Sequence, residues 1–148
     1  MESAEARRLF REIERGEAAS WLHFARRRRW QPLVFGVWAG MFVLSTALDG
    51  AARSLAALAL IAAPLAYVAR DRQRREVYPQ GRMPRELRRS TWALVVLSPA
   101  VALLAFVVHV TAGTWLAAAA TAVATVVAAE VYGRLYSADA EQVRRRLA

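Results

Sequence analysis

The sequence contains no cysteine and no lysine, and it has only two histidines among 148 residues. Without cysteine the chain can form no disulfide, no thiolate metal site and no thiol nucleophile. All 21 basic residues are therefore arginine. Together with the abundance of alanine, valine and leucine, this indicates the codon bias of a GC-rich bacterium.

Motifs that carry chemistry are also missing. The sequence has no glycine-rich phosphate loop, no His-Glu-x-x-His pair and no nucleophile elbow. Its carboxylates are few and scattered. The sequence thus predicts no catalytic residue, no cofactor and no metal site, and an enzymatic role, although left open, is disfavoured.

Hydrophobic and charged residues are both abundant, at 57% and 22%, but they occupy separate blocks. A membrane-spanning helix needs about 20 consecutive apolar residues, and four blocks approach that length. We therefore predict an all-α integral membrane protein with four transmembrane helices arranged as two helical hairpins. The predicted spans are 30–48, 51–69, 91–111 and 114–131.

Polar segments divide the chain around these spans. Residues 1–29 are predicted to form a polar helix followed by a basic segment, and 134–148 a polar helical tail, on either side of a transmembrane domain at 30–133. The basic loop 70–90 joins the two hairpins, which begin with similar arginine-tryptophan sequences, so an internal duplication remains open. A cleaved signal peptide is the alternative for the first block, but the stretch before it is long and acidic.

The arginines predict the orientation. The N-terminal segment holds 8, the 70–90 loop 8 and the C-terminal tail 4, whereas the two short turns hold only Arg53. Basic segments next to membrane helices remain in the cytoplasm, and an odd number of spans would put them on both sides. We expect a multi-pass protein of the bacterial cytoplasmic (inner) membrane with both termini in the cytoplasm.

Small residues mark two predicted packing faces. Gly36 and Gly40 form a GxxxG motif, which allows the backbones of two helices to approach closely. Either packing within the bundle or dimerisation would use it. In the last span small residues recur every four positions, and codon bias towards alanine is the alternative explanation. They are Ala117, Thr121, Thr125, Ala129 and Gly133.

Three ionisable residues are candidates for a function. Glu130 is the only acidic residue inside an apolar block, and such residues are often functional. Arg134 follows one turn later, so a structural ion pair is favoured over a proton relay or transport role. His109 lies near the outer end of its span, where contact with headgroups is favoured over proton sensing or ligand contact. His23 is expected at the opposite face, so the two histidines cannot share a metal or haem.

The 70–90 loop carries a net charge of +5 close to the membrane. Arginine clusters in such positions contact anionic headgroups, and no nucleic-acid-binding module accompanies them. We expect 70–75 and 85–89 to extend the neighbouring helices, with a turn at 78–81, and to contact anionic lipid or a protein partner. The residues expected to do so are Arg72, Arg74, Arg75, Arg85, Arg88 and Arg89.

Three functions remain open at this point. The absence of catalytic chemistry and the packing faces favour a non-catalytic accessory or interaction subunit of a membrane complex, with a protein partner or a homo-oligomer. A small oligomeric transporter or channel is the first alternative, although the apolar midplane of the spans argues against it. A lipid-modifying membrane enzyme is the second.

Overall fold

The computed structural model describes residues 16, 21–22, 29–74 and 83–147. Over these residues the chain is helical and has no strand, which confirms the all-helical prediction for this part of the protein. The elements are α2 (Gln31–Leu44), the 3₁₀ turn η1 (Ser45–Ala47), α3 (Gly50–Arg74), the 3₁₀ turn η2 (Arg85–Leu87), α4 (Arg88–Ala112) and α5 (Thr114–Leu147). The predicted polar helix in 1–29 lies almost entirely outside the described residues.

Three of these helices are long and apolar enough to cross a membrane. The segments are Gly50–Asp71, Arg85–Ala112 and Thr114–Arg146, with 22, 28 and 33 residues. The first apolar block is also helical, but α2 and η1 together form a shorter segment, Gln31–Ala47. These three segments therefore reach at least the length that a hydrocarbon core of about 30 Å requires.

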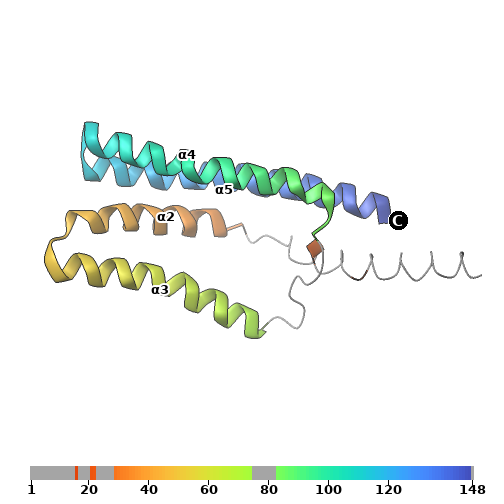
Figure 1. Cartoon of the computed structure of the whole chain (residues 1–148), viewed down its shortest axis with the longest axis horizontal. Coiled ribbons are helices and arrows are strands. Elements are labelled where there is room, and N and C mark those ends of the chain that lie inside the picture. Colours follow the sequence, from red (N-terminus) through yellow and green to blue (C-terminus); the bar gives the residue numbers. More distant parts are fainter. Residues whose placement is uncertain (1–15, 17–20, 23–28, 75–82, 148) are drawn as a thin grey trace, which may run out of the picture.

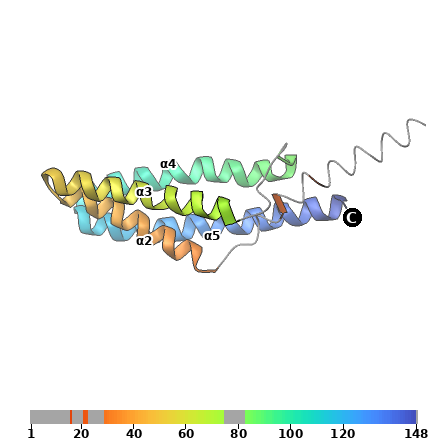
Figure 2. The same cartoon turned by 90° about the horizontal axis from the view of Figure 1, so that it is seen from below.

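The four helices lie side by side, and each runs antiparallel to its neighbour in the sequence (Figures 1 and 2). The antiparallel order puts the connection between α2 and α3 and the connection between α4 and α5 at the same end of the bundle. Gly50 and Gly113 in these connections have φ values of +57° and +85°, which favour glycine. We term this end, with residues 45–53 and 109–116, the turn end. The opposite end carries 70–74, 85–89 and 134–147, and we term it the basic end.

Helix α5 is the centre of the bundle. It packs against both α2 and α4 along much of its length, whereas α3 makes few contacts and touches α2 and η1. Consequently α2 packs mainly on α5, which belongs to the other pair, rather than on its sequence neighbour α3. The small side chains of α5 explain this, because they allow two helices to approach it closely.

At the basic end α5 does not stop where the apolar block ends. It continues as one helix of 34 residues to Leu147, so 134–147 is helical and continuous with the preceding segment. Helix α3 likewise runs on to Arg74, and η2 leads directly into α4 at Arg88. Helical extensions therefore flank the basic loop on both sides, while residues 75–82 lie outside the described part of the chain.

Candidate functional site

The two glycines of the GxxxG motif are buried where α2 meets α5. A Cβ atom added at Gly36 would lie 2.5 Å from Cγ2 of Val126 and 2.7 Å from the carbonyl oxygen of Ala122. One added at Gly40 would lie 3.1 Å from the carbonyl oxygen of Ala118. The motif is thus used inside the chain, where it brings the α2 and α5 backbones together.

The predicted small-residue stripe lies on a partly buried face of α5. Ala117, Thr121 and Gly133 are buried, and Thr125 and Ala129 are half-buried. The residues that meet the α2 glycines form the adjacent stripe, one position further along the chain: Ala118, Ala122 and Val126. No pattern in the sequence distinguishes this second stripe, because small residues occur around the whole circumference of α5.

A small core closes the basic end, where η2 and the start of α4 meet the last turns of α5. Leu87 and Val143 are fully buried there, and Ala140 is almost so. Beyond them, the carboxylate of Glu86 pairs with Arg146 at 2.9 Å. The extension of α5 is therefore anchored to the chain rather than projecting as a free tail.

A buried polar contact lies within this core. The backbone N–H of Ser90 donates to Oδ2 of Asp139 at 3.0 Å, and both residues are almost completely buried. Ser90 is the third residue of α4, where helix N–H groups have no partner within the helix. Asp139 thus caps α4 from α5. No sequence signal indicated this role, because an aspartate in a polar segment resembles any solvated carboxylate.

The aromatic residue next to this core connects it to the N-terminal segment. The hydroxyl of Tyr136 donates to the backbone carbonyl oxygen of Trp21 at 3.0 Å. Tyr136 also lies against Tyr132, with ring centroids 5.9 Å apart. Trp21, which precedes the first apolar block, is thereby hydrogen-bonded to α5.

The ionisable candidates are spread along the bundle rather than gathered. Glu130 is half-buried on α5 and Arg134, one turn later, is exposed. His109 is exposed at the end of α4, with Nδ1 3.4 Å from Oγ1 of Thr114. Glu130 is 16 residues from Thr114, about 24 Å along a helix. Among the described residues no three His, Asp or Glu side chains group as a metal site would require.

The loop arginines are partly described. Arg85, Arg88 and Arg89 are exposed at the basic end. Arg72 and Arg74 lie on the last turns of α3, and Arg75 falls outside the described residues. Among the described residues, these arginines lie at the basic end of the bundle, whereas Arg53 lies at the turn end.

Four buried polar side chains of the described residues, those of Ser45, Ser90, Thr121 and Asp139, bond to the backbone. Two further buried atoms, Nε1 of Trp21 and Oε2 of Glu86, have no hydrogen-bond partner among the described residues. Ser45 Oγ donates to the Phe42 carbonyl oxygen at 2.6 Å, and Thr121 Oγ1 to that of Ala117 at 2.6 Å. Ser90 Oγ donates to the carbonyl oxygen of Leu87 at 2.9 Å, while the Asp139 carboxylate accepts from an N–H as described above. These groups stabilise helix ends and turns.

Comparison with models of known protein families, with curated proteins and with solved structures finds no match to this chain.

Proposed function

We propose that the chain crosses a bacterial cytoplasmic membrane four times, with both termini in the cytoplasm. The arrangement of charge supports this topology, because the turn end has Arg53 as its sole arginine and the basic end carries the others among the described helices. The Gln31–Ala47 segment is the shortest candidate. At 1.5 Å per residue its 17 residues reach about 25 Å, slightly less than the hydrocarbon core of about 30 Å.

Reporter fusions test this topology. A reporter active only outside the cytoplasm should give signal when fused at residue 50 or 113, at the turn end. Fusions at residues 80 and 148 should give none. Signal at residue 148 would mean an odd number of spans and would overturn the proposal.

Within that membrane we propose a non-catalytic accessory or interaction subunit. The observation that carries this proposal is the engagement of the buried polar side chains, Ser45, Ser90, Thr121 and Asp139, in backbone hydrogen bonds. A transport path or an active site needs polar groups directed at a ligand, as intramembrane ionisable groups are in transporters. Among the described residues these four groups bond to the helix backbone instead, and the two buried polar atoms without a hydrogen-bond partner, on Trp21 and Glu86, lie outside the apolar blocks.

The partner surface that we propose is the outer face of α3. Leu55, Leu58 and Leu65 are each more than 60% exposed, and α3 has few contacts with the rest of the bundle. A helix held this loosely has most of its surface available for a protein partner or a second copy. The exposed face in a lipid bilayer would otherwise be covered by lipid alone.

Site-specific photo-crosslinking tests the partner surface. A photoreactive residue at Leu58 should form protein adducts in cells, and the same residue at Val123, exposed on α5, serves as the control. The Glu130→Gln variant should give the same Leu58 adducts, because Glu130 has no role in partner binding under this proposal. If Leu58 gives only lipid adducts, the α3 surface is not an interaction face.

The basic end is proposed to contact anionic lipid headgroups. Exposed Arg85, Arg88 and Arg89 lie at the start of the α4 segment, and each basic residue near an anionic surface contributes about 1 kcal/mol. Replacing Arg72, Arg74 and Arg75 by glutamine should leave insertion intact and reduce the anionic lipid that co-purifies. Unchanged retention of both lipid and partner would show that these arginines only set orientation.

A further inference from the structure

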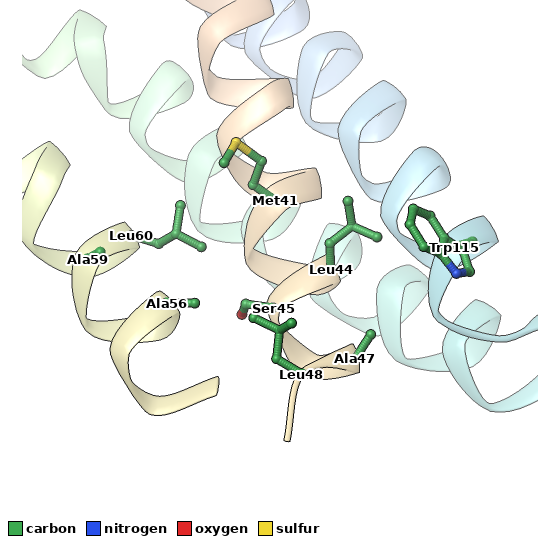
Figure 3. A pocket seen from close by; sticks show the side chains of 9 residues that line it. All are labelled: Met41, Leu44, Ser45, Ala47, Leu48, Ala56, Ala59, Leu60 and Trp115. Atoms are coloured by element: carbon green, nitrogen blue, oxygen red, sulfur yellow. The ribbon is translucent and has the colours of Figure 1, made fainter. Parts of the chain in front are cut away.

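An apolar recess of about 460 Å³ opens at the turn end. It lies across α2, with α3 on one side and Trp115 at the start of α5 on the other (Figure 3). Ala56 and Ala59 of α3 form one wall, where short side chains leave the space between the helices unfilled. Small-molecule sites range from about 300 to 1,000 Å³, so the recess is large enough for a ligand.

The lining determines what can enter. Met41, Leu44 and Leu60 present hydrocarbon to the recess. The polar lining side chain, Ser45, already donates its hydroxyl hydrogen to the carbonyl oxygen of Phe42. An open apolar recess within a bilayer is filled most favourably by hydrocarbon, because transfer of apolar surface out of water is favourable. The part of an occupant that enters must therefore be hydrocarbon.

A positive charge lies beside the recess on the same helix. Arg53 precedes Ala56 by three residues, so both lie on one face of α3, with Arg53 about 5 Å nearer the turn end. Helical side chains tilt towards the helix N-terminus, which directs the exposed Arg53 away from the apolar wall and towards that end.

We infer that this recess binds one phospholipid, with an acyl chain against Met41, Leu60 and Trp115 and the phosphate at Arg53. Met41 and Leu60 lie further into the bundle than Arg53, whereas Trp115 lies with Arg53 at the turn end. A chain that passes Trp115 and reaches Met41 and Leu60 therefore leaves its phosphate at the turn end, close to Arg53. The bound chain fills the gap beside α3, which has few protein contacts of its own. The inference rests on the proposed four-span topology, which puts the turn end in the outer leaflet.

Native mass spectrometry of the protein purified in mild detergent tests the site. The unmodified chain should retain one phospholipid more than Ala56→Phe, in which the recess is filled. Arg53→Gln should weaken the retention of this lipid about five-fold, as loss of one interfacial cation predicts, without disturbing the fold. Ala62→Phe is the matched control, because Ala62 is exposed on α3 away from both the recess and the basic end and should leave retention unchanged.

Fluorescence locates the bound chain independently. In vesicles of phospholipid with brominated acyl chains, Trp115 should be quenched in the unmodified protein and less so in Ala56→Phe. Subtracting the fluorescence of the corresponding Trp115→Phe proteins isolates the fluorescence of Trp115. Equal lipid retention by Ala56→Phe and the unmodified chain, or no retained lipid in either, would overturn the site. Reporter signals that reverse the orientation while the recess still retains lipid would overturn the topology alone.

Discussion

The indole N–H of Trp38 in α2 donates a 2.7 Å hydrogen bond to the backbone carbonyl oxygen of Leu60 in α3. That carbonyl lacks its usual donor four residues later, because Pro64 has no N–H. Trp38 therefore replaces the bond that the proline removes, and it attaches α3 to α2 at the same point.

A double-mutant cycle tests this relationship. Trp38→Phe should destabilise the protein by about 1 kcal/mol, because membrane hydrogen bonds contribute roughly 0.6 to 1.7 kcal/mol. In the Pro64→Ala background the Leu60 carbonyl regains a helical donor, so Trp38→Phe should cost much less. Unfolding in mixed micelles measures the loss of stability caused by Trp38→Phe in each background. Trp92→Phe, at an exposed tryptophan, is the control, and equal costs in the two backgrounds would disprove the compensation.

The close approach of α2 to α5 at Gly36 and Gly40 predicts different losses of stability when each glycine is replaced by alanine. Gly36→Ala should destabilise by about 1–3 kcal/mol, the usual cost of overpacking, because its Cβ would meet the Ala122 carbonyl at 2.7 Å. Gly40→Ala should cost less, since its nearest atoms would be 3.1 and 3.2 Å away. Thermal unfolding in detergent measures the order. A reversed order would mean that α2 and α5 approach each other differently.

The cap that Asp139 provides to α4 predicts a difference between two substitutions. Asp139→Ala leaves the buried Ser90 N–H without an acceptor and should cost about 1–2 kcal/mol. Asp139→Asn keeps an acceptor oxygen and should cost less. Glu141→Ala is the control, because its ion pairs with Arg144 and Arg145 are exposed and such pairs contribute at most about 1 kcal/mol. Chemical unfolding compares the three, and equal effects of Ala and Asn would disprove the cap.

The small-residue stripe of α5 predicts the effect of added volume. Thr125 is half-buried in the middle of this stripe, so Thr125→Leu should lower stability by about 1–3 kcal/mol if the face contacts another helix. Val123→Leu, at a position that is 65% exposed on the same helix, should be neutral. Loss of stability is measured as the shift of the thermal midpoint in detergent. A neutral Thr125→Leu would mean that this position faces lipid.

Local features of the sequence predicted the elements well. The expected 91–111 span is contained in α4, and the turn at Gly113 is present because glycine permits the positive φ that separates α4 from α5. The expected 51–69 span is contained in α3, where Pro64 does not end the helix. Apolar block length, glycine and charge are properties of neighbouring residues, so they can be recognised without knowing what packs against them. The number of spans and the orientation remain predictions.

By itself, then, the sequence determined the helical elements, their approximate limits and the separation of charged residues from apolar residues into different segments. Only the tertiary structure decided that α5 lies at the centre, that Gly36 meets Ala122, and that Asp139 caps α4 at Ser90. Those contacts join residues 49 or more positions apart, and α5 presents small side chains on every face. Which helices pack against which face of α5 therefore depends on how all four helices fit together. A pattern of neighbouring residues does not contain this information.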